Sequence, residues 1–252
     1  MKPADSPSAS DSAAATRTRA ELVALFEPGV FVAVWGVDVH EADSEVTALE
    51  PVERAAIDRA VEKRRVEFAR GRACARAALV AAGGEPVAIP VGPNREPRFP
   101  AGHVGAITHC DGFVAAVVAR GRDGQGAGAG GGSVGTPSPG PGLRGLGVDA
   151  ERLTRLEADV LGMIVTDFER SDPDWARPEK ACVLFSAKEA VFKAVFPVAG
   201  VWIGFEDVGL TVSGSSFRVG WASDAVDVPE LSRVRGRWTV VDGLVLTGCW
   251  LT

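Results

Sequence analysis

Two acidic residues stand two positions apart in the segment GVDAE, residues 147–151. The segment has the short apolar pattern of a strand, and residues two apart on a strand point to the same face. Asp149 and Glu151 would therefore project side by side. Neighbouring carboxylates repel each other unless a cation lies between them, and Mg²⁺ binds through one or two carboxylates plus substrate phosphates. The pair is a candidate metal site, with two solvated acids at a strand end as the alternative interpretation.

A third carboxylate lies in the helical segment FSAKEAVFKA, residues 185–194. Phe185, Glu189 and Phe192 follow i, i+4, i+7 spacing, and Lys193 lies one turn after Glu189 on the same face. That face is otherwise aromatic and should point inward, where ionisable groups must be paired or functional. Glu189 could complete the metal site and Lys193 could meet phosphate oxygens. The alternative is a solvated Glu–Lys pair worth about 0.3–0.5 kcal/mol.

A basic helical stripe is predicted over residues 52–80, where Arg64 and Arg72 lie two turns apart on nearly the same side. Guanidinium forks bind two phosphate oxygens at once. The alternative is a salt-bridged, solvated face, because four acids share this segment. His109 follows Thr108 at the end of a predicted strand, where polar groups can reach a ligand, although a lone histidine is more often structural.

Composition excludes several classes of protein. The net charge of −6 and a pI near 5.2 argue against a general binder of nucleic acid or anionic membranes, while a local basic face stays open. The sequence lacks an apolar run of the roughly 18 residues that a membrane span needs, and the N-terminus lacks the apolar region of a signal peptide. Four cysteines without a CxxC pair suggest reduced thiols, so we expect a cytoplasmic protein.

The elements that must position these residues alternate between helices and strands in both halves of the chain. Hairpin strands are predicted around a turn in 104–119, and a tight turn at Asp242-Gly243 joins the last two strands. We expect helices over 51–82, over 155–165 and from Pro178 to a residue before Pro197.

This pattern predicts an α+β fold of two similar α/β lobes, each a small antiparallel sheet with packed helices. The stretch between the lobes is almost entirely Gly, Ser, Pro and Ala, which cannot bury enough surface to order itself. The expected division is a disordered tail, an N-terminal lobe, a linker or insertion, and a C-terminal lobe, at 1–20, 21–120, 121–145 and 146–252.

Taken together, these segments resemble the 4′-phosphopantetheinyl transferases, in particular the Sfp-like branch that includes enterobactin synthase component D. The resemblance runs from about Glu53 to Pro197 and keeps the family's order. VEKRRVEFARGRACARAAL is similar to the family's arginine-bearing helix, and NREPRFP (94–100) to its Pro-containing loop. AITHC, GVDAE and FSAKEAVFKA resemble its Ser/Thr-His, metal-strand and KE-helix motifs.

The resemblance implies transfer of the phosphopantetheine arm from coenzyme A to a serine of an acyl or peptidyl carrier protein, with release of adenosine 3′,5′-bisphosphate. The active site would lie between the lobes. Asp149, Glu151 and Glu189 would hold Mg²⁺, with Mn²⁺ as an alternative. Glu189 would be the base, directly or through a metal-bound water, and Lys193 would meet the α-phosphate side and the charge on the leaving group.

The remaining residues carried over from the family bind coenzyme A. Arg72 and His109 are expected on the 3′-phosphate, and the other contacts would come from Arg64, Arg95, Thr108 and Lys188. Arg95 stands where the family often has Lys. We expect a monomer whose carrier belongs to siderophore, polyketide, nonribosomal-peptide or lipid synthesis. Two competing hypotheses are a Mg²⁺-dependent nucleotide pyrophosphate hydrolase and a non-catalytic coenzyme A-binding protein on the same fold.

Overall fold

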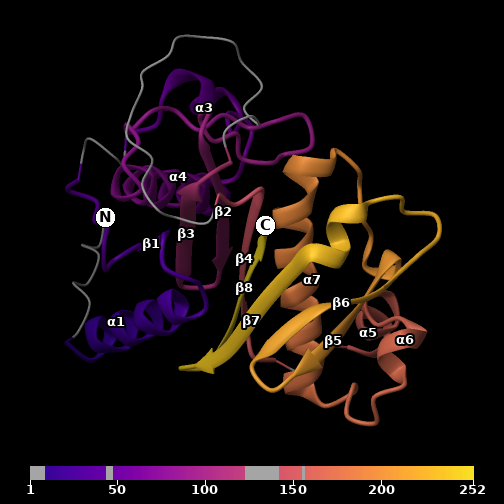
Figure 1. Cartoon of the computed structure of the whole chain (residues 1–252). Helices are drawn as coiled ribbons and strands as arrows, with labels where there is room; N and C mark the ends of the chain where they lie inside the picture. Colours follow the sequence, from indigo (N-terminus) through magenta and orange to yellow (C-terminus); the bar gives the residue numbers. More distant parts are fainter. Residues whose placement is uncertain (1–8, 44–47, 123–141, 155–156) are drawn as a thin grey trace.

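The computed structural model of the chain describes residues 9–43, 48–122, 142–154 and 157–252 (Figure 1). Two antiparallel sheets organise this part of the chain, a three-stranded sheet of order β1-β3-β2 and a five-stranded sheet of order β4-β8-β7-β6-β5. Helices pack on both sheets, and β2 of the first sheet lies against β4 of the second. The predicted two-lobe α+β fold is confirmed, although the two sheets differ in strand number.

The N-terminal lobe places one long helix against its sheet. Ala73, Cys74 and Ala78 of the helix α4 are fully buried against alternate residues of β3, and their small side chains let helix and sheet approach closely. The elements of this lobe are β1 (Val30–Val34), α3 (Pro51–Ala55), α4 (Glu62–Ala81), β2 (His103–Cys110) and β3 (Phe113–Arg120). The predicted hairpin around Cys110 and Gly112 is thus present as β2 and β3.

The single helix predicted over residues 51–82 is wrong, because the chain turns between α3 and α4. Arg65 stabilises that turn, donating from Nη2 to the carbonyl of Asp58 and from Nε to the carbonyl of Ala60. Periodicity alone does not reveal such a break, because residues 56–61 hold no Gly or Pro and the partner of their carbonyls is a side chain of the next helix.

In the C-terminal lobe the long helix α7 lies directly on β4 and β8 (Figure 1). Glycines permit the closest contact: a Cβ on Gly145 or Gly147 would stand 2.1 or 2.0 Å from the carbonyl oxygens of Ala194 or Ala190. The lobe comprises β4 (Gly145–Arg152), α5 (Ala158–Ile164), α6 (Asp167–Arg170), α7 (Pro178–Ala199), η1 (Phe205–Asp207), β5 (Val208–Ser213), β6 (Ser216–Ala222), η2 (Pro229–Arg233), β7 (Val234–Val241) and β8 (Leu244–Leu251).

Two boundaries in the C-terminal lobe were predicted from the sequence, the turn between β7 and β8 and the end of α7. The tight turn between β7 and β8 is confirmed, with Asp242 and Gly243 at φ 49° and 74°, as a two-residue hairpin loop requires. The prediction that α7 ends before Pro197 is wrong, since the helix continues to Ala199 and Gly200 caps it at φ 66°. Pro197 removes only one N–H, and it does so within the last turn, where the loss is tolerated.

A helix also occupies most of the predicted disordered tail. Residues 1–8 lie outside the described part, but α1 covers Ala9–Ala24, so the expected disorder is wrong from residue 9 onward. Leu22, Leu25 and Phe26, at its end and just beyond, are buried against strands of both sheets. Alanine has the highest helix propensity, and the apolar anchors come only after residue 20, so the polar composition was misleading. Of the predicted linker 121–145, residues 123–141 lie outside the described part.

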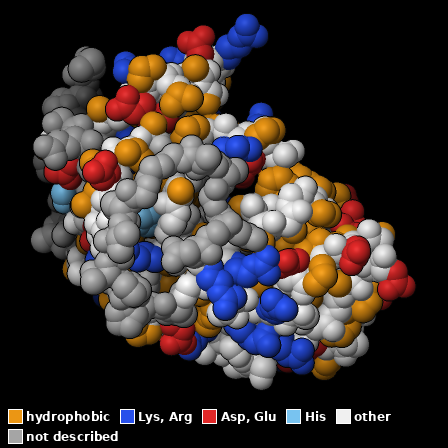
Figure 2. Space-filling model, turned by 45° about the horizontal axis from the view of Figure 1, so that its top comes forward, with side chains coloured by type: hydrophobic (Ala, Val, Ile, Leu, Met, Phe, Trp, Pro, Cys, Tyr) orange, Lys and Arg blue, Asp and Glu red, His pale blue; other side chains and the backbone are white. Residues whose placement is uncertain are grey.

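The surface mixes charges of both signs. Figure 2 shows that Lys and Arg side chains gather in a band on one face, so a local basic face coexists with the net charge of −6. Among the described helices, none combines the length and apolarity that crossing a membrane requires.

Candidate active site

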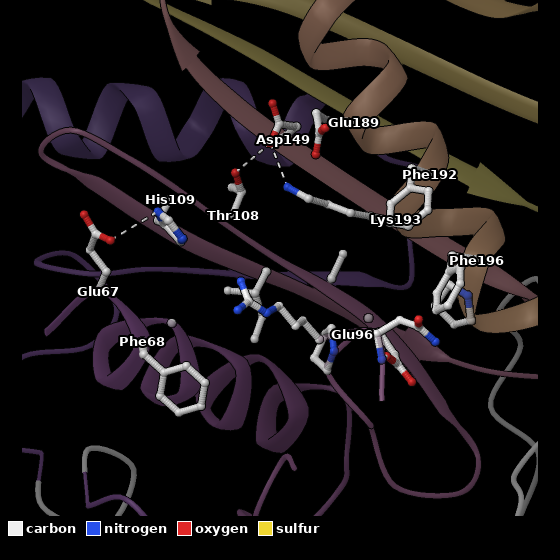
Figure 3. Close-up of a pocket in the computed structure, with 18 of the residues that line it drawn as sticks. Glu67, Phe68, Glu96, Thr108, His109, Asp149, Glu189, Phe192, Lys193 and Phe196 are labelled. Carbon is white, nitrogen blue, oxygen red and sulfur yellow. Dashed lines mark hydrogen bonds and ion pairs between the residues drawn. The ribbon is translucent and has the colours of Figure 1, made fainter. Parts of the chain in front are cut away.

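A cavity of about 480 Å³ lies where the two lobes meet. Its walls come from α4 and β2 of the N-terminal lobe, from the loop around residues 94–97, and from β4 and α7 of the C-terminal lobe (Figure 3). Nine of the ten predicted site residues line it: Arg64, Arg72, Arg95, Thr108, His109, Asp149, Glu151, Glu189 and Lys193.

Asp149 is the most fully bonded acid of the cavity. Lys193 Nζ donates to its Oδ1 at 2.7 Å and Thr108 Oγ1 to the same oxygen at 3.2 Å (Figure 3). Ser186 Oγ donates to Oδ2 at 2.8 Å. The carboxylate is buried, so these donors offset its lost hydration. The three donors come from β2 and α7, so Asp149 ties the N-terminal lobe to α7.

Glu151 and Glu189 lie near Asp149, and burial and the charge of Asp149 raise the pKa of both. Burial raises the pKa of Glu151 to about 7, and the charges of Asp149 and Glu189 add to the shift against the opposing effect of Lys193. The pKa of Glu189 is also raised, first by burial and then by Asp149, with Lys193 opposing. Acids held in this way stabilise an added cation, because a positive charge among them relieves both desolvation and repulsion.

The donor set fits a hard divalent cation held in an open site. Within the described residues, no group of three or more His, Cys, Asp or Glu side chains is arranged so that it could hold a metal ion. Mg²⁺ does not need one, since it binds through one or two carboxylates and takes water and phosphate oxygens for the rest. Asp149 and Glu151, two residues apart on β4, could provide such oxygens, and Glu189 lines the same cavity.

Arg72 of α4 lines the side of the cavity that belongs to the N-terminal lobe. It is buried, donates from Nε to the carbonyl of Ile89 at 2.7 Å, and places its guanidinium 4.3 Å from the ring centre of Phe68. Burial, then the neighbouring Arg76 and Arg64 charges, lower its pKa to about 10, against the effect of Glu53. Arg72 therefore stays charged at neutral pH, and its other nitrogens are available to an anion in the cavity.

His109 and Arg64 form a pair beside it. Arg64 Nη1 lies 2.5 Å from His109 Nε2, and Glu67 lies 3.8 Å from Nδ1 on the other side (Figure 3). The pKa of His109 is lowered, first by burial and then by Arg64 and Lys193, while Glu67 and Asp149 oppose the shift. A neutral imidazole can accept the Arg64 proton at Nε2, so the pair holds its geometry at neutral pH.

The loop that carries Arg95 is held in a strained but well-bonded conformation. Arg95 has φ 70°, in the left-handed region, and its N–H bonds to the carbonyl of Gly92 at 3.0 Å. The base of the loop is tied by a fully buried ion pair, Glu53 with Arg76 at 2.7 Å, because Glu53 also accepts the N–H of Ile89. These contacts place Arg95 at the cavity.

Lys188 is the predicted ligand residue that the structure removes from the site. It is buried on the other side of α7 and donates to Glu169 at 2.8 Å and to the carbonyls of Ile164 and Phe205 at 2.6 and 2.8 Å. This geometry does not support the expectation that Lys188 contacts coenzyme A, because its ammonium already has three acceptors. It lies about 100° round the helix from Glu189, so the two adjacent side chains serve different surfaces.

Sequence reasoning missed four residues that shape the site. The sequence placed Ser186 in a motif without giving it a role, but the buried Ser186 hydroxyl donates a hydrogen bond to the buried Asp149. Glu67 and Glu96 line the cavity and Phe68 underlies Arg72. Their spacing could have revealed Glu67 and Phe68, because they lie three to five residues from Arg64 and Arg72 on one helix and so close to the same face.

The geometry defines a class of enzyme: a two-lobe α+β protein whose interlobe cavity sets carboxylates and a lysine against arginines and a histidine. The family model described as "4'-phosphopantetheinyl transferase N-terminal domain" matches residues 52–119, and that of the "4'-phosphopantetheinyl transferase superfamily" matches residues 145–239.

Characterised relatives agree. The chain is 38% identical to 4'-phosphopantetheinyl transferase PptT of Mycobacterium tuberculosis over 210 residues, 78% of this chain and 83% of the relative. It is 35% identical to Svp of Streptomyces mobaraensis over 231 residues, 84% of each chain, and 34% identical to Npt of Nocardia iowensis over 215 residues, 78% of this chain and 86% of the relative. A holo-[acyl-carrier-protein] synthase structure from Thermotoga maritima matches more weakly, with TM-score 0.37 and 20% identity over 43% of this chain and 63% of that one.

The chain belongs to the 4′-phosphopantetheinyl transferase family and is an enzyme that transfers phosphopantetheine to carrier proteins. This membership favours transfer over the competing hypotheses of a pyrophosphate hydrolase and a non-catalytic binder.

Proposed function

We propose that the enzyme moves the 4′-phosphopantetheine arm of coenzyme A to a serine hydroxyl of an acyl or peptidyl carrier protein and requires Mg²⁺. One observation carries the proposal: a single cavity places three carboxylates and Lys193 opposite Arg64, Arg72 and Arg95. That arrangement suits a substrate with several phosphates, one end bound by cations of the protein and the reacting end by carboxylates and a metal.

In this proposal the N-terminal lobe binds the nucleotide end of coenzyme A. Arg72 is buried and fixed by Ile89 and Phe68, so its guanidinium offers an oriented fork to the 3′-phosphate. The Arg64–His109 pair lies beside it, where the neutral imidazole orients Arg64. Arg95 contributes a third cation from its loop, and Thr108 keeps its hydroxyl on Asp149.

The C-terminal lobe performs the transfer. Glu189 accepts the proton of the carrier serine, whose oxygen attacks the β-phosphorus, which carries the pantetheine arm. The bond between this phosphorus and the bridging oxygen of the pyrophosphate breaks, and adenosine 3′,5′-bisphosphate leaves with the electron pair. The raised pKa of Glu189 brings it closer to neutrality, which suits a general base. Lys193, which donates to Asp149 at 2.7 Å, stabilises charge on the leaving group.

Asp149, Glu151 and Glu189 would hold Mg²⁺. The ion would neutralise pyrophosphate oxygens and keep them in line for transfer.

Incubation with coenzyme A, Mg²⁺ and a panel of apo-carrier proteins tests the proposal by mass spectrometry. We expect the carrier to gain the mass of the phosphopantetheine arm and adenosine 3′,5′-bisphosphate to appear in equal amount. Release of the bisphosphate without any carrier would instead identify a hydrolase, and an unmodified carrier panel would refute transfer.

Glu189→Gln should abolish transfer while the far-UV circular dichroism and melting temperature stay close to wild type. Glu179→Gln is the matched control, because Glu179 is exposed in the first turn of the same helix. Full activity of Glu189→Gln would contradict its assignment as base and metal ligand, and equal loss in Glu179→Gln would show that the assay reports helix stability only.

A further inference from the structure

Two buried hydroxyl groups, those of Ser186 and Thr247, lie next to Asp149 but outside the cavity. Ser186 comes from α7, and Thr247 lies directly opposite Asp149 where β4 pairs with β8. Both side chains are fully buried, and neither is among the residues that line the cavity. Ser186 Oγ lies 2.8 Å from Asp149 Oδ2 and 2.9 Å from Thr247 Oγ1. The three side chains therefore form a continuous hydrogen-bonded line from β8 through α7 to β4.

The hydroxyl protons along this line point in one direction. An ionised carboxylate accepts hydrogen bonds but cannot donate them, so the single Ser186 hydroxyl proton points to Asp149 Oδ2. The contact between the two hydroxyls then requires the Thr247 proton, which also lies within reach of the Ser186 carbonyl at 3.0 Å. Thr247 thus donates to Ser186, and Ser186 donates to Asp149.

Thr247 matters because a serine within a helix has a competing acceptor. Serine hydroxyls in the middle of α-helices often bond to the carbonyl four residues earlier, which for Ser186 is that of Cys182. In that rotamer Asp149 Oδ2 would lose its donor. The Thr247 hydroxyl stabilises the rotamer that the structure shows, because it donates to Ser186 Oγ there and strengthens the next hydrogen bond in the line.

The Ser186 bond helps to set the orientation of the Asp149 carboxylate. The donors to Oδ1, Lys193 and Thr108, both line the cavity, where an incoming substrate can reach them (Figure 3). Ser186 is buried outside the cavity, so its bond to Oδ2 persists when substrate binds and leaves. Hydrogen bonds of this kind orient metal ligands, and their loss typically costs about 10–100-fold in metal affinity or activity.

We propose that Ser186 and Thr247 are positioning residues for the metal site. Ser186 holds the Asp149 carboxylate in the orientation that meets the cation, and Thr247 acts only through Ser186. The inference rests on the proposed function, because it needs Mg²⁺ at Asp149. Both residues should therefore control metal affinity although neither lines the cavity.

Binding of Mn²⁺ to the protein alone tests the proposal, with electron paramagnetic resonance measuring the free ion. Ser186→Ala should raise the Kd for Mn²⁺ at least tenfold, and Thr247→Val at least threefold. Thr247→Ser keeps the donor and should stay within twofold of wild type. Thr18→Val is the matched control, because Thr18 is also buried but lies on α1 and does not line the cavity. It should stay within twofold as well.

The double variant Ser186→Ala/Thr247→Val distinguishes a relay from two independent effects. If Thr247 acts only through Ser186, the double variant should bind Mn²⁺ within twofold of Ser186→Ala. Independent residues would instead multiply their fold-losses, which would refute the relay.

The Mg²⁺ dependence of transfer gives a second readout. The Mg²⁺ concentration for half-maximal transfer should rise in the same order as the Kd for Mn²⁺, while kcat at saturating Mg²⁺ and the KM for coenzyme A stay within threefold of wild type. A wild type whose transfer does not depend on Mg²⁺ would refute the metal requirement of the proposed function, which is a separate result.

Three outcomes would overturn the positioning role. The first is unchanged or tighter metal binding in Ser186→Ala, and the second is an equal loss in Thr18→Val, which would mean that the assay reports stability of the fold. The third is an equal loss in Thr247→Ser and Thr247→Val. Because this last comparison needs no change at Ser186, it decides the proposal even if Ser186→Ala does not fold.

Discussion

Loss of the Lys188 ammonium should destabilise the fold without weakening the binding of coenzyme A. Lys188→Met keeps a side chain of similar length and removes three hydrogen bonds, to Glu169, Ile164 and Phe205. The Glu169 carboxylate then stays buried with only the donors of Thr166 and the Leu210 N–H. Breaking a buried ion pair by removing one partner costs about 3–5 kcal/mol, out of a typical total of about 5–15 kcal/mol.

Urea denaturation followed by tryptophan fluorescence measures this loss. Lys180→Met is the control on the same helix, because its pair with Asp172 is partly exposed and contributes about 0–1 kcal/mol. The double variant Lys188→Met/Glu169→Gln should recover part of the stability, because the unpaired charge is gone. A Lys188→Met variant within 1 kcal/mol of wild type would refute the reasoning, and so would normal stability with a tenfold weaker coenzyme A affinity, which would restore Lys188 to the binding site.

Two further predictions concern α1 and His109. Leu22→Ala should lower the free energy of unfolding by about 2–5 kcal/mol in urea denaturation, because Leu22 is fully buried beneath both sheets, whereas Val23→Ala on the exposed side should change it by less than about 0.5 kcal/mol. Equal effects would mean that α1 does not brace the lobes. The lowered pKa of His109 means that the unfolded chain takes up its proton at higher pH than the folded one, so stability should fall as pH drops below about 6.5 and level off beneath the folded pKa. His109→Gln should show a smaller loss between pH 7.5 and 5, and an identical loss would contradict the assignment of this pH dependence to the half-buried His109.

Much of the fold could be predicted because local sequence and tertiary contact point the same way. The hairpin from β2 to β3 consists of two β-rich runs on either side of a Gly-containing turn, and Asp242-Gly243 is a turn signal that needs no distant partner. The residues that line the cavity could be predicted for a similar reason. Asp149 and Glu189 lie in short motifs whose spacing indicates which face of β4 and of α7 each occupies. The packing of α7 on the glycines of β4 brings these two faces together.

The features that were missed depend on distant partners. The break before α4 is stabilised by Arg65, and the helix α1 depends on burial of Phe26 against strands that lie far along the chain. The sequence grouped Lys188 with its neighbour Glu189, which lines the cavity, but a helix turns by 100° per residue and Lys188 points elsewhere. Its partner Glu169, 19 residues earlier, carries no local signal of the pairing.

Lys188 and Lys193 of α7 differ in burial and in hydrogen bonding. Lys188 is saturated by three acceptors and buried, so it fixes α7 against α5, α6 and η1. Lys193, one turn beyond Glu189, is a quarter exposed and has a bond to Asp149 that faces the cavity. A phosphate can bind a partly exposed ammonium such as that of Lys193. It cannot bind a buried ammonium such as that of Lys188 without breaking hydrogen bonds that stabilise the fold. The buried side of α7 thus fixes the positions of Glu189 and Lys193, while the side that carries them stays open to the cavity.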